Sequence, residues 1–276
     1  MKFVKSLTNL ALAGLLTTTS VFATEKEISA DEAAKELANP NTAFASLTFK
    51  NQFKSYDDGS EVKLTLFQPS LPFTMDSGDK VIFRPAVPII HDNRSNESGI
   101  GDIGFDLVFA PKQEDPTSLM AFGMVGSLPT GSSDVGGGEV VAVGPALFLG
   151  KFKADGTGLI GAYTSHLESI DEGELGDAGK MSVTSSQLMW INIEQGGWTW
   201  GSAPKVEYNH EIEDEKLTLP VNFTVSKTTI LGGRAWKFGM DFDYYVEKND
   251  LYTPDYMITF SITPVVENVI NTWIHN

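Results

Sequence analysis

Residues 236–244, Trp-Lys-Phe-Gly-Met-Asp-Phe-Asp-Tyr, alternate large apolar side chains with charged or small ones. Residues 218–226, Thr-Leu-Pro-Val-Asn-Phe-Thr-Val-Ser, show the same two-residue period. Successive side chains of a β-strand point to opposite faces, so each stretch predicts a strand with one apolar and one polar face. A chain that repeats this pattern over most of its length is typical of a transmembrane β-barrel with a lipid-facing outside and a wet inside.

The pattern recurs in about twelve segments, each close to the ~9–11 residues with which a tilted strand crosses a bilayer. Turn-forming residues separate them, for example Asp57-Asp58-Gly59-Ser60. The predicted strands are 47–56, 61–70, 80–90, 102–110, 118–128, 139–151, 157–167, 181–194, 198–209, 216–226, 234–246 and 255–264. An even number closes a single-chain barrel with both chain ends in the periplasm, and it puts the longest gap, 168–180, outside. We therefore predict an all-β fold, a transmembrane antiparallel β-barrel of about 12 strands with a short N-terminal helix.

Three regions follow one another along the chain. Residues 1–23 read as a signal peptide, because two lysines precede a short apolar stretch and a small-residue cleavage site. Residues 24–46 form an N-terminal segment, in which a capping box at Ser29–Glu32 opens a short helix that Asn39-Pro40 ends. This segment is expected either in the periplasm or tucked into the barrel mouth. Residues 47–276 form the outer-membrane barrel and a C-terminal tail.

The composition limits the partners of the chain. It contains 20 Lys and Arg against 36 Asp and Glu, a net charge of −16, which argues against binding to nucleic acid. It contains no cysteine, so stability has to come from the strand network. The expected partners are outer-membrane lipids and lipopolysaccharide, the barrel-assembly machinery and small-molecule solutes. The acidic turns read as solvated loops or, alternatively, as cation-binding loops among lipopolysaccharide phosphates.

The faces of the strands follow from the cost of charge in lipid. A Lys or Arg that faces lipid at mid-depth costs roughly 2–4 kcal/mol, so charged side chains are expected to face the lumen. Folding two neighbouring strands about their loop puts Arg84 nearly opposite Asp106, either as a self-neutralising structural pair or as a constriction that selects solutes. The candidate lumen and selectivity residues are Lys50, Lys63, Arg84, Asp102, Asp106, Lys205, Glu207, Asp241 and Asp243.

Motifs for chemistry are weak. Residues 99–104, Gly-Ile-Gly-Asp-Ile-Gly, match the dinucleotide-binding pattern, but they run into a predicted strand and not into the helix that this motif requires. The four histidines lie far apart in the sequence, without metal-ligand spacing, and Gly-x-Ser-x-Gly is absent. We therefore predict no catalytic residue, no metal site and no cofactor.

Several short motifs follow one another in a set order, namely Gln68–Phe73, Val81–Pro88, Gly99–Ile103, Phe109–Pro111, Leu128–Thr130 and Val143–Pro145. The chain is similar to the outer-membrane transporter family assigned to the meta-cleavage pathway of phenol degradation, whose members are often mislabelled neuromedin U. The resemblance covers most of residues 36–264 and implies an outer-membrane β-barrel that passes small hydrophobic or aromatic molecules. The chain departs from the usual barrel pattern because it ends in the tail 267–276 and not in an aromatic residue of the last strand.

The first functional hypothesis is a passive channel or transporter for small solutes, hydrophobic or aromatic ones included, in the outer membrane of a Gram-negative bacterium. An alternative is a structural or surface-interaction barrel with acidic outer loops. A third is an outer-membrane lipid hydrolase, which the missing serine motif disfavours.

Overall fold

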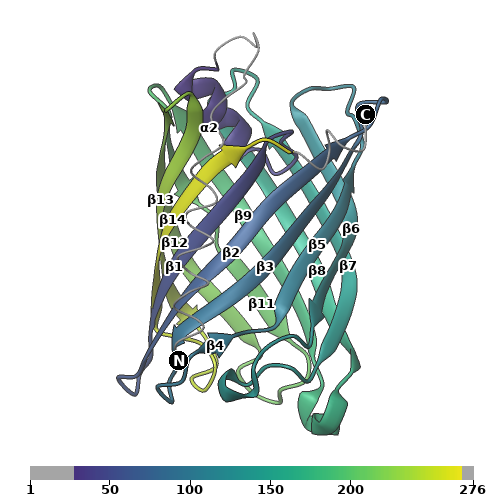
Figure 1. Cartoon of the computed structure of the whole chain (residues 1–276), viewed down its shortest axis with the longest axis vertical. Helices are drawn as coiled ribbons and strands as arrows, with labels where there is room; N and C mark the ends of the chain where they lie inside the picture. The colour runs from purple at the N-terminus through teal and green to yellow at the C-terminus, as the bar shows by residue number, and fades with distance from the viewer. Residues whose placement is uncertain (1–27, 269–276) are drawn as a thin grey trace.

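The computed structural model describes residues 28–268 (Figure 1). The predicted signal peptide, residues 24–27 and the end of the C-terminal tail, 269–276, lie outside the described residues. Within 28–268, no helix is long and apolar enough to cross a membrane.

One closed antiparallel sheet makes up almost the whole structure. Fourteen β-segments form it, but β4 is a two-residue extension beside β3, and β10 and β11 share one position in the wall, which leaves twelve strands around the barrel. The elements are α2 (Ala30–Ala38), β1 (Ala45–Ser55), β2 (Glu61–Thr74), β3 (Lys80–Asp92), β4 (Gly99–Ile100), β5 (Ile103–Ala110), β6 (Ser118–Leu128), η1 (Ser133–Val135), β7 (Val141–Phe152), β8 (Gly158–Asp171), η2 (Gly173–Gly179), β9 (Ser182–Glu194), β10 (Trp198–Ser202), β11 (Lys205–Asn209), β12 (Leu217–Leu231), β13 (Arg234–Glu247) and β14 (Tyr256–Val266).

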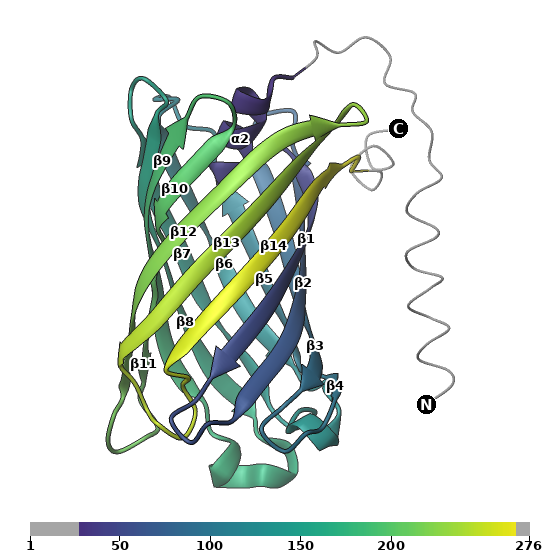
Figure 2. The same cartoon turned by 90° about the vertical axis from the view of Figure 1, so that its left-hand side faces the viewer.

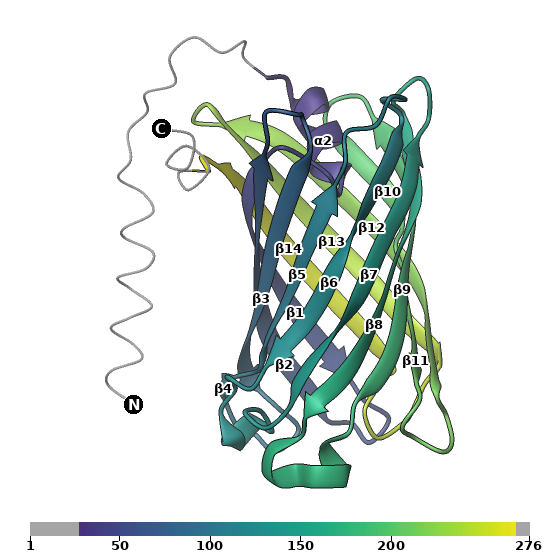
Figure 3. The same ribbon diagram turned by 90° about the vertical axis from the view of Figure 1, so that its right-hand side faces the viewer.

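The first and last strands close the barrel. β1 pairs with β14 from Ala45 opposite Val266 to Ser55 opposite Tyr256, and the other strands pair with their neighbours in sequence. Figures 2 and 3 show the tilted strands from two sides. The predicted twelve-stranded antiparallel barrel is therefore confirmed.

The predicted strand 198–209 is interrupted. Ser202 ends β10 and Lys205 begins β11, with Pro204 between them. Proline has no N–H for the ladder, so it interrupts pairing in the middle of a sheet. Asn222 of β12 bridges the break, because its side-chain oxygen accepts a hydrogen bond from the Ala203 N–H at 2.6 Å.

The two ends of the barrel differ. At the helix end, where α2 lies (top of Figure 1), the strands are joined by the short turns 75–79, 111–117, 153–157, 195–197 and 232–233. At the opposite, loop end the connections are 56–60, 93–102, 129–140, 172–181, 210–216 and 248–255, and most of them are longer. Because β8 continues to Asp171, the longest connection is 129–140 and not the predicted gap 168–180.

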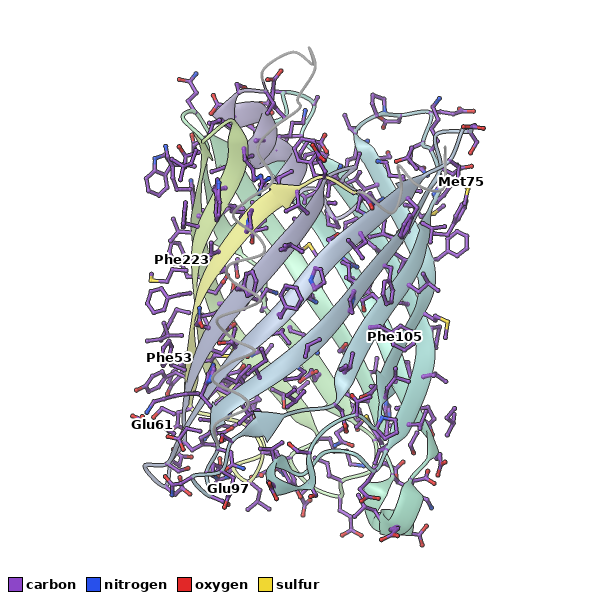
Figure 4. The ribbon with its side chains drawn as sticks, in the orientation of Figure 1. Phe53, Glu61, Met75, Glu97, Phe105 and Phe223 are labelled. Atoms are coloured by element: carbon purple, nitrogen blue, oxygen red, sulfur yellow. The ribbon has the colours of Figure 1, made fainter. Side chains whose placement is uncertain are left out.

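Opposite residues of paired strands point to the same face, so the register assigns each side chain to the outside or the lumen. Phe223 lies opposite Phe242 on the outside, and Phe49 lies opposite Phe67 with stacked rings 4.8 Å apart. Phe223 and Phe53 stand away from the barrel wall in Figure 4 and are 48% and 43% exposed. The predicted inversion, with apolar side chains outside, therefore holds.

The N-terminal helix forms as predicted. The Ser29 hydroxyl accepts a hydrogen bond from the Glu32 N–H at 3.2 Å, and the Glu32 carboxylate accepts one from the Ser29 N–H at 3.0 Å. This capping box satisfies two donors that a helix N-terminus leaves free. The helix lies at the mouth of the barrel, as Figures 2 and 3 show.

Candidate functional site

The lumen has a polar wall, formed by the inward faces of β1, β14, β13 and β12. In one register row Thr48, Thr263, Lys237 and Thr228 lie side by side, and in another Gln52, Thr259, Asp241 and Thr224 do. Hydroxyl and charged side chains therefore line this half of the tube. The polar wall comprises Thr48, Lys50, Gln52, Lys54, Asn222, Thr224, Ser226, Thr228, Lys237, Asp241, Asp243, Thr259, Ser261 and Thr263.

Beyond β1, along β2, β3 and β5 to β7, much of the lumen wall is apolar. Near the loop end, Leu64 faces Ile90 and Leu66 faces Pro88, and these four half-buried residues form what we call the apolar patch. Nearer the helix end lies a packed inner cluster, in which the Phe148 ring rests against Gly150 and Gly161. The members of this inner cluster, Ile82, Val108, Ala110, Ala121, Val125, Ala146 and Phe148, are at most 8% exposed.

Arg84 and Asp106 come together as predicted. They are directly opposite in the pairing of β3 with β5, and Arg84 Nε lies 3.3 Å from Asp106 Oδ2. Their side chains are only 21% and 20% exposed. Tyr163 of β8 donates a hydrogen bond from its hydroxyl to Asp106 Oδ1 at 3.1 Å, and its ring lies 5.5 Å from the Arg84 guanidinium carbon. The three side chains connect the charged part of the lumen to the inner cluster.

Tyr163 was not predicted as a lumen residue from the sequence. It lies in a strand whose two faces are both largely apolar, so the two-residue period does not show which face is inside. Its partner in β7 is Phe148, which the structure places inside. One signal in the sequence pointed to a polar partner for Tyr163, namely a tyrosine in a largely apolar strand. A buried Tyr hydroxyl usually needs a hydrogen-bond partner.

Other predicted lumen residues also face inward. Lys205 Nζ lies 2.7 Å from Glu207 Oε1 on the same face of β11. Asp243 is 7% exposed and accepts a hydrogen bond from the Asn222 side-chain amide at 2.8 Å. Asp241 lies one step along the same face and is close enough to Lys50 and Lys237 to interact with both charges.

The prediction for Lys63 is wrong. Lys63 is opposite Phe53, which points outward, and its ammonium pairs with Glu61 at 2.9 Å. It lies near the start of β2 at the loop end, where a β-bulge follows it. The cost of an outward charge falls to about 0–1 kcal/mol near the membrane interface, so the rule that sends charge inward does not hold there.

Asp102 is engaged in a loop, and its predicted selectivity role stays a prediction. Asp102 precedes β5 at the loop end, and its Oδ1 accepts hydrogen bonds from the backbone N–H groups of Gly131 and Gly138, at 2.7 and 2.8 Å. The carboxylate thereby holds both ends of the glycine-rich part of loop 129–140. These two hydrogen bonds favour a structural role for Asp102 in this loop.

Replacing Asp102 by alanine is expected to release loop 129–140 without changing ion selectivity. Each lost hydrogen bond to a charged acceptor is worth about 1.5–3 kcal/mol, and both bonds act on the same loop. Limited proteolysis should show faster cleavage within 129–140. Asp134→Ala, an exposed acidic residue of the same loop, is the matched control and should leave the cleavage rate unchanged. A change of reversal potential in Asp102→Ala with intact protection would instead support the predicted selectivity role.

Helix α2 narrows the helix end of the lumen. Its Ala33 and Ala34 are at most 1% exposed, and Ala38 packs against the inward residues Phe152 and Leu159. The Asp31 carboxylate accepts a hydrogen bond from the Gly197 N–H at 2.5 Å, which ties the helix to the turn between β9 and β10. The sequence predicted the helix but gave no signal that it would lie in the mouth of the lumen.

Two cations tie the loops together at the loop end. Arg94 donates to Ser60 Oγ at 3.0 Å, to Asp58 at 2.6 Å and to the Leu251 carbonyl at 2.6 Å. Lys248 contacts three carboxylates, those of Asp57, Asp250 and Asp255. Burial lowers the pKa of Lys248, but the hydrogen bonds to these carboxylates outweigh it and hold the pKa above its ordinary value. The network joins three loops over the seam between β1 and β14.

The three histidines within residues 28–268 are not part of the lumen wall. His166 and His210 lie with their ring centres 5.7 Å apart, and the Thr184 hydroxyl contacts both rings at 3.0 Å. Register places His166 and Thr184 on the outer face. His91 contacts the Thr65 hydroxyl, also outside, and His275 lies outside the described residues. Among residues 28–268, no group of three or more His, Cys, Asp or Glu is arranged to hold a metal ion.

Comparisons with known proteins place the fold. The chain is similar to an outer-membrane channel from Pseudomonas putida F1, with a TM-score of 0.62 and 11% identity over 81% of this chain and 96% of that chain. It is also similar to the NanC porin, with a TM-score of 0.54 and 10% identity over 81% of this chain and 99% of that one. At this identity the likeness shows the fold alone.

Sequence comparisons add nothing to this result. No family model matches the chain, and no curated protein matches it either. The resemblance to the phenol-degradation transporter family is therefore not confirmed and stays a prediction.

Proposed function

We propose that the protein is a passive channel for small solutes in the outer membrane of a Gram-negative bacterium. The observation that carries the proposal is the inversion of the closed barrel, apolar outside and charged inside. Phe223, Met240 and Phe260 are 39–48% exposed on the outside, whereas Arg84, Asp106 and Lys50 face the lumen. A soluble protein would bury the first set and expose the second.

Aromatic residues on the outside support the membrane location. Trp190, Trp198 and Trp200 are 38–50% exposed close to the helix end, and Tyr208 and Tyr244 are 41% and 51% exposed close to the loop end. Such residues at both strand ends match the two aromatic girdles of outer-membrane barrels at the membrane–water interfaces.

The unequal connections support an orientation. Outer-membrane barrels have short periplasmic turns and longer extracellular loops, so we place the helix end in the periplasm. Lipopolysaccharide then surrounds the loop end, and the barrel-assembly machinery is the proposed folding partner. The proposal needs no catalytic residue, metal or cofactor.

The solutes are proposed to be small and at least partly apolar. The lumen is not a uniformly charged aqueous pore, because the apolar patch and the inner cluster occupy one side of it. A twelve-stranded barrel also lies between ~8 strands, which side chains can fill, and ~16 strands, which leave an open channel. Hydrophobic or aromatic solutes fit such a lumen better than large polar ones.

Reconstitution tests the proposal. The purified mature protein should stay folded in cold SDS, change mobility on boiling and conduct ions in planar bilayers. Liposome swelling with a panel of small solutes should rank them by size and apolar character. A folded barrel that never conducts would favour the alternative of a structural or surface-interaction barrel. A soluble periplasmic protein without a mobility shift would contradict the membrane location.

Removal of residues 28–38 is expected to increase the single-channel conductance, because α2 fills part of the helix-end mouth while every strand pair remains. Ala34→Asp is a second test that keeps the helix in the chain. It places a charge where the alanine is 1% exposed, which should weaken the packing of the helix in the mouth. Glu36→Gln, on the same helix, is the control. Conductance equal to wild type in both variants would show that the helix does not limit the flow of ions.

A further inference from the structure

A lysine of the lumen lies directly beside an apolar surface. Lys50 is opposite Leu66 in the pairing of β1 with β2, and Leu66 is opposite Pro88 in β3. The next row towards the loop end holds Gln52, Leu64 and Ile90. Opposite residues share a face, so Lys50 and the apolar patch line the same stretch of the lumen.

The ammonium of Lys50 has unused hydrogen-bonding capacity. Lys50 Nζ donates to the Gln68 side-chain oxygen at 3.0 Å, and an ammonium group can donate three hydrogen bonds. Among the described residues Lys50 forms no ion pair. Asp241, Arg84 and Asp106 lie close enough to interact with the Lys50 charge, but no carboxylate of residues 28–268 forms an ion pair with it. The buried Nε of Arg84 has no hydrogen-bond partner although Asp106 is near.

Positive charge is in slight excess in the middle of the lumen. Five inward cations, Lys50, Lys54, Arg84, Lys205 and Lys237, stand against four inward acids, Asp106, Glu207, Asp241 and Asp243. The pairs Arg84–Asp106 and Lys205–Glu207 use two of each. Three lysines remain against two aspartates, of which Asp243 is already hydrogen-bonded to Asn222.

We infer that this junction of Lys50 and the apolar patch binds a small amphipathic anion, whose anionic head lies at Lys50 and Arg84 and whose hydrocarbon tail lies on Leu64, Leu66 and Ile90. The inference rests on the proposed channel function and gives it a substrate class. A free ammonium donor in a narrow tube with an apolar wall attracts an anion more strongly than it would in bulk water. An apolar tail gains by covering a half-buried surface that water otherwise contacts.

Four probe molecules distinguish the contribution of the anionic head to binding from that of the hydrocarbon tail. Hexanoate carries both features, acetate only the anion, 1-hexanol only the tail, and hexyltrimethylammonium the tail with the opposite charge. The full mature barrel is reconstituted in planar bilayers, and the concentration of each probe that halves the ion current is measured. Binding is measured in parallel by isothermal titration of the barrel in lipid nanodiscs, with empty discs as the blank.

We expect hexanoate to act at a concentration about tenfold or more below that of the other three probes. 1-Hexanol and hexyltrimethylammonium lack its charge-assisted hydrogen bond, and acetate lacks its apolar tail. Lys50→Gln should lose this advantage, and Lys50→Arg, which keeps the charge, should retain it. Lys63→Gln is the matched control, since Lys63 lies on the outer face of the neighbouring strand. Leu66→Ser should weaken hexanoate and leave acetate unchanged.

The outcomes distinguish the inference from the channel proposal. A barrel that conducts but treats all four probes alike, or in which Lys50→Gln changes nothing, overturns the inference and leaves the channel standing. A barrel that never conducts but binds hexanoate in the nanodisc assay with the same dependence on Lys50 supports the anion site and overturns the channel.

Discussion

Phe223→Arg is expected to destabilise the inserted barrel by roughly 2–4 kcal/mol, because it puts a cation on the lipid face near mid-depth. Phe223 lies near the middle of β12, is 48% exposed and faces Phe242 on the outer surface. The measurement is reversible unfolding by urea in lipid vesicles, followed by tryptophan fluorescence and by the mobility shift in SDS.

Thr224→Arg is the matched control for that substitution. The two residues are neighbours in the same strand at nearly the same depth, but Thr224 faces the lumen opposite Asp241. An arginine there meets water and a carboxylate, so a loss well below that of Phe223→Arg is expected. The reverse order of stability would invert the face assignment, and equal losses would show that the outer face is not in lipid.

Most of the fold was predictable because the same alternation of outward apolar and inward polar residues recurs in most strands. Where the outward residues are Phe, Met or Leu and the inward ones are charged, as in β13, the period identifies both the strand and its face. Arg84 and Asp106 were predictable as a pair for the same reason, since a hairpin brings inward residues of neighbouring strands into register. The break between β10 and β11 divides one predicted strand without changing the number of strands around the barrel, and its cause is Pro204.

The wrong face predicted for Lys63 has a physical cause. Lys63 and Asp102 lie at the loop end, where water reaches the side chains and charge no longer has to face the lumen. A long lysine there can reach solvent from the outer face. Asp102 instead accepts hydrogen bonds from a loop that is distant in sequence, and its glycine partners show no periodic pattern.

Parts of the lumen depended on contacts that no local pattern encodes. Tyr163 reaches Asp106 from a strand that is not its neighbour, across 57 positions of sequence. Helix α2 was predictable as a helix from its capping box. Its position in the barrel mouth depends on the hydrogen bond that the Gly197 N–H donates to Asp31. Long-range contacts of this kind require the closed barrel before they exist.

Arg84→Ala and Asp106→Ala are expected to shift ion selectivity in opposite directions. The two side chains are about one-fifth exposed and neutralise each other at 3.3 Å. Removing Arg84 leaves the Asp106 carboxylate with only the Tyr163 hydroxyl, so the pore should prefer cations more than wild type does. Removing Asp106 leaves the Arg84 guanidinium without its counter-charge, so the pore should prefer anions more.

Reversal potentials in a salt gradient measure both shifts, because a fixed charge in a narrow tube with low-dielectric walls acts strongly on passing ions. The double variant Arg84→Ala/Asp106→Ala should return towards wild type, since it removes equal and opposite charges. Tyr163→Phe removes only the hydroxyl donated to Asp106 and should shift the potential little. Single variants that conduct at the wild-type potential would make the pair a structural brace of the wall, because charges that faced the ion path could not be removed without effect.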